Sequence, residues 1–293
     1  MPITKPSLIT TQADARCSRA FVRPSKLIAL VAALLFGAAP IYGNPQRVVS
    51  LNLCTDQLLM LLADGDQIAS LSKIATDPRT SPMAQHAQGF AINSGDAEEI
   101  FMQAPDLVLA GTYTEQGTVQ MLRSLGVTVE IFAPEQNFDD IRQNIARMGQ
   151  LLGHPQRADT MLRDFDDRLA QLTDGITQRP RAALYSANGY TTGAETMAGH
   201  ILSAAGFDNI ATEAGISWGG TLPLETLVML QPDLVITGST YPGHSRSEEI
   251  LRHPALTPLK SITQTGAKWV CGTPAVLDAV ADLQRAHPDK GAK

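Results

Sequence analysis

The sequence predicts an α/β fold of two lobes, each with a mainly parallel sheet flanked by helices, joined by one long connecting helix. Three observations predict this class. Short apolar runs alternate with helical stretches on both sides of the middle of the chain, which is typical of βαβ units. The middle itself has helical periodicity and no strand signal. One motif also occurs once on each side, which indicates two lobes with related architecture.

The first α/β region is predicted to span residues 44–138. Its short apolar runs indicate buried strands, and the segments between several of them have helical spacing. The predicted strands are Arg47–Leu53, Ile68–Leu71, Leu107–Ala110 and Val127–Phe132, and helices are predicted at about Thr55–Leu62 and Thr118–Leu125. Ligands of open parallel sheets bind beyond the carboxyl ends of the strands, so the loops that follow these strands are candidates for a site.

Residues 139–178 are predicted to form a helical connector. Apolar side chains recur at helical spacing from Ile141 to Leu172, with an interruption at Gly153-His154-Pro155. Because proline ends or kinks a helix, this pattern predicts a helix, a short break and a long helix.

The second α/β region is predicted to span residues 179–293. Predicted strands are Ala182–Tyr185, Leu234–Thr237 and Lys268–Cys271, and predicted helices are Thr196–Ala205 and about Pro274–Arg285. Gly206 suits the residue that follows a helix, and Pro274 suits a first helical turn.

Residues 1–43 are predicted to be a signal peptide. A basic stretch precedes the apolar run Leu27–Ala39, which is too short for an ordinary membrane-spanning helix but has the length of a signal-peptide core. Small residues follow, so cleavage is expected near Gly43; a short membrane anchor is the alternative. The mature chain is therefore expected outside the cytoplasm. The full 293-residue sequence has a formal net charge of −6, which argues against a nucleic-acid partner.

The repeated motif reads AEEIFMQAPDLVLAG at residues 97–111 and LETLVMLQPDLVITG at residues 224–238. Each copy predicts a short helix, a turn at Pro-Asp and a buried strand. Asp106 and Asp233 are expected to bond backbone amides in the turns. From their chemistry alone, Glu98 and Glu225 are most simply solvated helix charges.

These two copies, together with the opening RVVSLNLCTDQLLMLLADGDQIASLS, resemble the cobalamin- and ferric-siderophore-binding family of periplasmic binding proteins, over about Arg47–Arg285. The resemblance implies a non-enzymatic carrier that captures a corrinoid or a ferric-siderophore chelate and delivers it to an ABC importer. It also implies that one glutamate per lobe docks onto arginines of the permease dimer. Glu98 and Glu225 occupy those positions, and Glu99 is a neighbour able to replace Glu98. We expect a monomer.

Nine residues in or near the loops after strands are candidates for ligand binding. Aromatic side chains suit a large, flat, partly apolar chelate. The alternative for each aromatic is an ordinary half-buried side chain, and the equal alternative for Arg79 is a surface charge. The candidates are Asn52, Thr55, Asp77, Arg79, Tyr113, Tyr190, Trp218, Tyr241 and Trp269. No resident cofactor is expected, because the chelate is cargo.

Three interpretations of the cysteines remain open. Cys17 lies in the predicted signal peptide, which leaves Cys54 and Cys271 in the mature chain. The two form a disulfide, stay as free thiols, or bind a ligand's metal as thiolates; the oxidising compartment favours the disulfide.

Other functions are weaker on the sequence. A carrier of free metal ions needs three or four converging ligands, and of the six histidines only His244 follows a strand, so no metal site is expected. The chain has neither GxSxG nor the P-loop GxxxxGK[ST], so an enzyme is not expected. A haem carrier remains an alternative, with Tyr113, Tyr190, Tyr241 or His244 as axial ligand. The lack of a basic cluster puts a corrinoid ahead of an anionic siderophore.

Overall fold

The computed structural model describes residues 44–238, 243 and 245–286. The predicted signal peptide, Tyr241 and His244 therefore lie outside the described residues. No helix in the described part is long and apolar enough to cross a membrane.

The first sheet is parallel and has the strand order β3-β2-β1-β4-β5. Alternate strand residues point to its two faces, so Val48 and Leu107 join one apolar cluster while Val49 and Val108 join another. Residues from helices α2 and α6 pack in the first cluster, and residues from α4 and α5 pack in the second. The elements are β1 (Val48–Ser50), α2 (Leu53–Leu62), β2 (Ile68–Ser72), α3 (Ala84–Ala87), β3 (Ile92–Asn93), α4 (Ala97–Met102), β4 (Leu107–Gly111), α5 (Gln116–Ser124), β5 (Val129–Phe132) and the short 3-10 helices Gly65–Gln67 and Lys73–Thr76.

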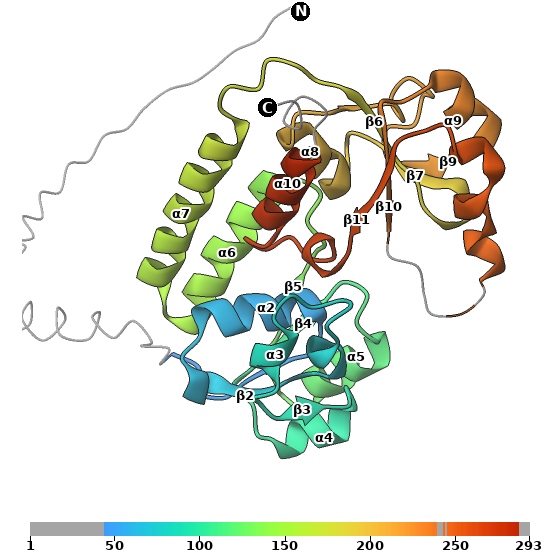
Figure 1. The fold of residues 1–293 in the computed structure, drawn as a ribbon. Coiled ribbons are helices and arrows are strands. Elements are labelled where there is room, and N and C mark those ends of the chain that lie inside the picture. Colours follow the sequence, from blue (N-terminus) through green and yellow to red (C-terminus); the bar gives the residue numbers. More distant parts are fainter. Residues whose placement is uncertain (1–43, 239–242, 244, 287–293) are drawn as a thin grey trace, which may run out of the picture. The chain divides into compact units, whose positions relative to one another are not determined.

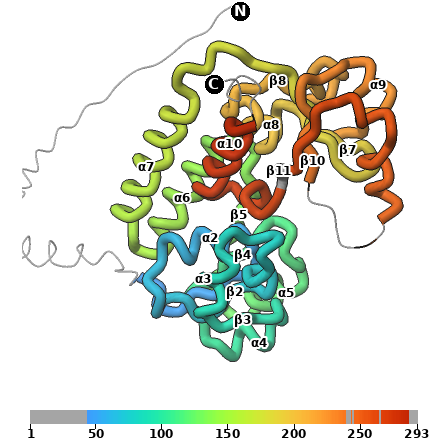
Figure 2. The backbone as a smooth tube through the Cα atoms, in the orientation of Figure 1, coloured from blue at the N-terminus to red at the C-terminus, as the bar shows by residue number. Residues whose placement is uncertain are grey.

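The connector comprises two helices, α6 (Phe138–Leu152) and α7 (Pro155–Thr173), which lie side by side (Figures 1 and 2). Gly153 and His154 separate them, as the helix–break–helix pattern predicted. The long helix is α7, with 19 residues.

The second sheet is also parallel, with the order β11-β10-β6-β8. The strands β7 and β9 form a separate, two-stranded antiparallel sheet. The strands of the parallel sheet alternate in the same way, with Ala182 and Leu234 in the first cluster and Ala183 and Val235 in a third. The elements are β6 (Arg181–Leu184), β7 (Tyr190–Thr192), α8 (Met197–Ala204), β8 (Asp208–Asn209), β9 (Gly219–Thr221), α9 (Leu224–Leu230), β10 (Leu234–Gly238), β11 (Ser261–Thr265), α10 (Val276–Arg285) and the 3-10 helices Ala187–Gly189, Arg246–Arg252, Pro254–Leu256 and Ala267–Trp269.

One apolar cluster extends through both α/β regions. It contains Leu58 of α2, Ile145 of α6, Phe165 of α7, Leu202 of α8 and Val280 of α10. From Asn44 onward the chain accordingly clusters as one compact unit. The predicted α/β class is confirmed, whereas the boundaries at residues 138 and 178 stay predictions.

The predicted strand Lys268–Cys271 is wrong. Ala267–Trp269 is a single 3-10 turn, and the strand is Ser261–Thr265, which pairs with β10 at the edge of the sheet. An edge strand is not enclosed by neighbours on both sides, so its sequence, SITQT, lacks the apolar run by which central parallel strands are recognised.

The two repeat copies fold alike. Asp106 Oδ2 accepts a hydrogen bond from the backbone N of Arg47 (3.0 Å), and Asp233 Oδ2 accepts one from the backbone N of Arg181 (2.8 Å). Each aspartate thereby fixes the start of the strand next to its own, β1 or β6. Ala104 (φ 47°) and Gln231 (φ 44°), which immediately precede the prolines of the two copies, share an unusual left-handed conformation.

Candidate functional site

Asn52 lies at the carboxyl edge of the first sheet, where it caps the start of helix α2. Its side-chain Oδ1 accepts hydrogen bonds from the backbone N of Cys54 (2.9 Å) and of Thr55 (3.4 Å). This is the usual role of asparagine before a helix, because the first amides of a helix lack partners within it. Thr55 is buried, and its hydroxyl bonds Asn52 O (2.9 Å) and Ser50 Oγ (2.8 Å). Both predicted ligand residues therefore also organise the loop.

A pocket of about 50 Å³ at this edge brings three of the predicted residues together: Asn52, Thr55 and Tyr113. Tyr113 follows β4 and has 86% of its surface exposed, so its ring is available to a ligand. The remaining lining residues are Cys54, Leu58, Gly111, Thr112, Phe132, Ala133, Pro134 and Glu135.

Glu135 is a member of this pocket that the sequence analysis missed. Its carboxylate accepts hydrogen bonds from Asn144 Nδ2 of α6 (2.6 Å) and from the backbone N of Gly272 (3.2 Å). Burial raises the pKa of Glu135 above its usual value. Gly272 has no room for a side chain, since a Cβ there would collide with Glu135. The signal was available, because Glu135 lies in the loop after a predicted strand.

A second pocket, of about 340 Å³, shares Asn52 with the first pocket. Its lining residues follow β1, β2 and β3: Leu51, Asn52, Leu53, Ser72, Lys73, Ile74, Asn93, Ser94 and Gly95. Lys73 gives this pocket a cationic side chain. Asn93 is buried and donates through Nδ2 to Ser50 O (3.0 Å) and Ser70 Oγ (3.0 Å). The two pockets together thus lie at the carboxyl ends of all five strands of the first sheet.

Cys54 and Cys271 form a disulfide beside the first pocket, with their Cα atoms 5.1 Å apart. Nearby, Thr273 Oγ1 donates to Gln57 Oε1 (3.2 Å). The segment before α10 is therefore attached to the first α/β region by a covalent bond and by hydrogen bonds to Gln57 and Glu135.

Asp77 and Arg79 bind each other and line none of these pockets. Arg79 Nη2 lies 2.6 Å from Asp77 Oδ2, and the hydrogen bonds from Arg79 lower the pKa of Asp77 to about 2. The pair stabilises the loop after the 3-10 helix Lys73–Thr76.

Tyr190 is the first residue of β7, and Trp218 immediately precedes β9, the strand with which β7 forms an antiparallel pair. Tyr190 is 48% exposed and Trp218 is 56% exposed. The backbone of Trp218 accepts a hydrogen bond from Gly193 N, which follows β7. Gly219 has no space for a side chain, because the Tyr190 hydroxyl occupies the position of its Cβ. The sequence analysis named both aromatics but not the strand pair that presents them.

Trp269 is only partly buried, and its side chain packs against the cluster that both α/β regions share. The structure therefore gives this residue a packing role, which is the ordinary alternative for a single aromatic. The prediction for Tyr241 is not addressed by the described residues.

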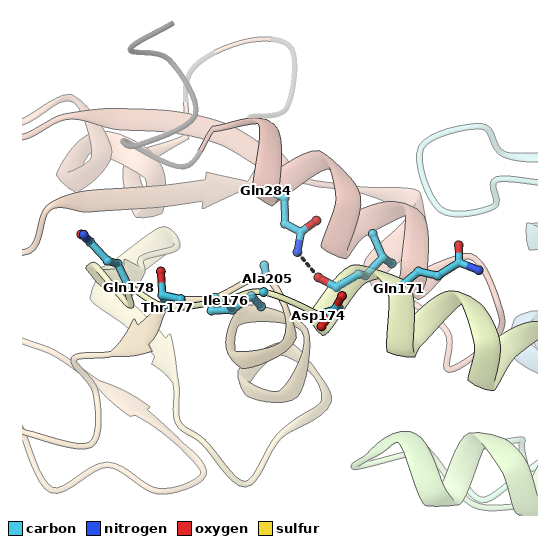
Figure 3. Close-up of a pocket in the computed structure, with 10 residues that line it drawn as sticks. Gln171, Asp174, Ile176, Thr177, Gln178, Ala205 and Gln284 are labelled. Atoms are coloured by element: carbon cyan, nitrogen blue, oxygen red, sulfur yellow. Dashed lines mark hydrogen bonds between the residues drawn. The ribbon is translucent and has the colours of Figure 1, made fainter.

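A further pocket, of about 320 Å³, is lined by the end of α7, the segment leading to β6, and Gln284 of α10 (Figure 3). The Gln284 side chain donates a hydrogen bond to Leu172 O. None of the predicted ligand residues lines this pocket. It lies before the start of β6, whereas ligands of parallel sheets bind beyond the opposite, carboxyl ends of the strands.

Glu98 and Glu225 are exposed in the first turns of α4 and α9. Neither makes a hydrogen bond or an ion pair with any residue that the structure describes. Within the same residues, no group of three or more histidines, cysteines or acidic side chains is placed to hold a metal ion.

Comparison with known proteins connects this architecture to one family. A family model described as periplasmic binding protein matches residues 48–262. The cobalamin-binding protein of Halobacterium salinarum is 31% identical over 201 residues, which are 67% of this chain and 54% of that protein. The vitamin B12-binding protein of Photorhabdus laumondii is 25% identical over 204 residues, 68% of this chain and 73% of that protein. The chain thus spans about half the length of the first of these relatives.

Solved structures share the fold. A periplasmic haem-binding protein from Pseudomonas aeruginosa superposes with a TM-score of 0.67 at 22% identity, over 83% of this chain and 92% of that one. The periplasmic vitamin B12-binding protein of Vibrio cholerae gives a TM-score of 0.63 at 19% identity, over 85% of this chain and 99% of that one. The chain belongs to the periplasmic binding protein family.

Proposed function

We propose that this protein is the extracytoplasmic substrate-binding component of an ABC importer and that its cargo is a metal chelate, a corrinoid or a ferric siderophore. It binds one ligand and delivers it without turnover. Residues 1–43 act as a signal peptide cleaved near Gly43, and the mature protein works in the periplasm as a monomer.

The observation that carries the proposal is the set of exposed aromatics beyond the carboxyl ends of strands in both sheets. Tyr113 follows β4 in the first region, and Tyr190 and Trp218 stand beyond β6 in the second. Exposed aromatic rings bind the flat, partly apolar faces of a large chelate and leave hydrogen-bonding groups such as Asn52 for its polar rim.

The names of the relatives support the same class of cargo. Those from Halobacterium salinarum and Photorhabdus laumondii are described as binding cobalamin or vitamin B12, and an Escherichia coli relative, 25% identical over 203 residues, is described as binding ferric enterobactin. The relative from Halobacterium salinarum, 31% identical, is described as cobalamin-binding, which puts a corrinoid first.

Haem is a second candidate cargo, and one observation favours it. The Tyr113 phenol is 86% exposed at the rim of the first pocket, and a tyrosine oxygen is one of the axial ligands that haem iron accepts. Haem would then be bound through an iron–oxygen bond, unlike a corrinoid held by ring contacts alone.

Tryptophan fluorescence tests the proposal, because Trp218, the residue before β9, is exposed and its emission is quenched by an adjacent chromophore. Cyanocobalamin, ferric enterobactin and haemin are titrated separately into the chain from Asn44 onward. Saturable quenching with one of them, lost in Trp218→Leu but kept in Trp269→Leu, supports a chelate at this position. Linear, non-saturating quenching with all three contradicts the proposal.

A further inference from the structure

The two repeat copies present the same local surface on the two α/β regions. In both, a left-handed residue precedes the proline, and an aspartate accepts a backbone hydrogen bond from the neighbouring strand, at Asp106 and at Asp233. The helices α4 and α9 begin at equivalent positions of the two copies, Ala97 and Leu224, and α9 is one residue longer. Equivalent side chains on these helices therefore occupy equivalent positions.

Met102 and Met229 are such a pair. Each lies four residues after the glutamate of its copy, Glu98 or Glu225. Met102 is 84% exposed and Met229 is 82% exposed, and neither packs in an apolar cluster of the described residues. Residues four apart lie on one face of a helix, so each region shows a carboxylate and a methionine side by side.

A single exposed methionine is ordinary on a protein surface. Here the same residue is exposed at the same repeat position twice, and each copy stands beside a carboxylate that makes no hydrogen bond or ion pair with the described residues. The two positions that flank this methionine differ between the copies: Phe101 corresponds to Val228, and Gln103 to Leu230. A feature that is present on two equivalent surfaces of one chain suits a partner made of two identical subunits, each with the same binding surface.

We propose that Met102 and Met229 are matched apolar anchors that dock the carrier onto a dimer of identical permease subunits, each methionine filling an apolar depression beside a basic side chain that pairs with Glu98 or Glu225. The inference rests on the proposed function for the existence of that permease. The docking role of the glutamates comes from the family resemblance; the anchors come from the structure. Methionine suits this role because its flexible thioether adapts to an irregular apolar surface.

The neighbouring carboxylates disfavour the other occupants of such a surface. Inner-membrane lipids are rich in anionic headgroups, which attract basic rather than acidic patches. A second copy of the chain would oppose glutamate to glutamate if the same surfaces met, and like charges in close contact oppose association. A basic, partly apolar protein surface satisfies both the methionine and the carboxylate.

The test measures binding of the full exported protein to its permease–ATPase complex in lipid nanodiscs, by biolayer interferometry. The variants are Met102→Ser, Met229→Ser and the double substitution. Met121→Ser is the matched control, because Met121 is a 43% exposed methionine on α5, outside the repeat. Met102→Leu and Met229→Leu keep the apolar volume and serve as the conservative variants. Cyanocobalamin, ferric enterobactin and haemin titrations of every variant report the ligand site separately.

We expect Met102→Ser and Met229→Ser each to weaken permease binding about tenfold, the difference expected for burial of a methionine side chain. The double variant weakens it further, because two linked contacts act together. Met121→Ser and the leucine variants bind like the unchanged protein, and ligand affinity is the same throughout.

Several results overturn the inference. If permease binding is unchanged in both serine variants, or reduced in only one, the two methionines are not matched anchors. This result would not contradict the proposed carrier function. Methionine-dependent binding to phosphatidylglycerol–phosphatidylethanolamine vesicles without permease assigns the surface to lipid. Methionine-dependent dimerisation in sedimentation experiments assigns it to a second copy. An unchanged protein that binds neither the permease nor any of the three ligands overturns this inference and the proposed function together.

Discussion

Cys54 and Cys271 are joined by a disulfide although 217 positions separate them in the chain. Cys54 lies in the first turn of α2, and Cys271 lies between the 3-10 helix Ala267–Trp269 and α10. The bond stands at the rim of the pocket that Asn52 and Tyr113 line. It therefore attaches the last segment of the chain to the carboxyl edge of the first sheet, where the ligand is proposed to bind.

Loss of this disulfide is expected to reduce stability without unfolding the protein. A cross-link that closes so long a loop restricts the unfolded chain, and the entropic estimate of its contribution is about 5 kcal/mol. The double variant Cys54→Ser with Cys271→Ser, and the unchanged protein under reductant, should both shift to lower urea midpoints. Equal midpoints, or two thiols that react with Ellman's reagent in the unfolded, unreduced protein, would show that the bond is absent.

Asp56 predicts an unusual pH dependence of stability. Its side chain is fully buried in α2 and accepts hydrogen bonds from the backbone N (3.0 Å) and the hydroxyl of Ser72. Burial raises the pKa of Asp56 from 3.8 to about 7 and outweighs the hydrogen bonds from Ser50 and Ser72, which lower it. Between these two values the folded protein holds a proton that the unfolded chain has released.

The contribution of Asp56 to stability is therefore complete below pH 4 and is lost as the pH rises through 7. We expect Asp56→Asn, which carries no charge, to reduce the difference in unfolding free energy between pH 5 and pH 8, an effect on the order of a few kcal/mol. The measurement is urea unfolding at a series of pH values. An identical pH dependence in the variant would mean that Asp56 is ionised in the folded protein at neutral pH.

The repeat aspartates are expected to contribute similarly to stability. Asp106 and Asp233 each hold the backbone at the start of a neighbouring strand, so Asp106→Ala and Asp233→Ala should each lower the unfolding free energy by about 1 kcal/mol. Asp159→Ala is the control, because Asp159 is exposed on α7 and bonds none of the described residues. A change in one variant but not in the other would show that the two copies are not energetically equivalent.

The central strands were predictable because they are buried on both faces and read as continuous apolar runs. Val48–Ser50, Leu107–Gly111 and Leu234–Gly238 all fall where the apolar sequence predicted them. The two-residue strands Ile92–Asn93 and Asp208–Asn209 were not predicted, and neither was the edge strand Ser261–Thr265. Strands this short or this polar carry little pattern, and tertiary pairing decides where they form.

The site was predictable only in part, for a related reason. The rule that ligands bind beyond strand ends found Asn52, Thr55 and Tyr113, which line one pocket. The rule cannot show which side chains pair with each other, so it did not reveal that Asp77 and Arg79 form an ion pair. The same rule pointed to the loop that holds Glu135, but the contact with Gly272 that gives this residue its place joins positions 137 apart in the chain and has no local sequence signal.

Removal of Glu98 and Glu225, the proposed docking carboxylates, is expected to separate transport from binding. In the double variant Glu98→Ala with Glu225→Ala, ligand affinity stays unchanged, because neither side chain lines a pocket at the carboxyl edge of the first sheet. Uptake of the labelled ligand by cells that carry the variant is lost. Weaker ligand binding by the purified double variant would instead place these carboxylates in the ligand site.

The exposed aromatics are expected to determine ligand affinity. Tyr113→Ala and Trp218→Ala should each weaken binding of the preferred chelate about tenfold, because each removes a ring contact. Phe101→Ala is the control, since Phe101 is a 45% exposed aromatic on α4, away from the carboxyl-edge pockets. If haem is the cargo, the single substitution Tyr113→Phe should alter the absorption spectrum of the bound haem, because it removes the phenol oxygen.

The central claim is that the protein carries a metal chelate, and calorimetric titration of the chain from Asn44 onward tests it most directly. Cyanocobalamin is titrated first, then ferric siderophores, then haemin. The account predicts one-to-one binding of one of these ligands, with cyanocobalamin first in order, at nanomolar to micromolar affinity. Absence of binding with all three, by a protein that unfolds cooperatively in urea, would contradict it.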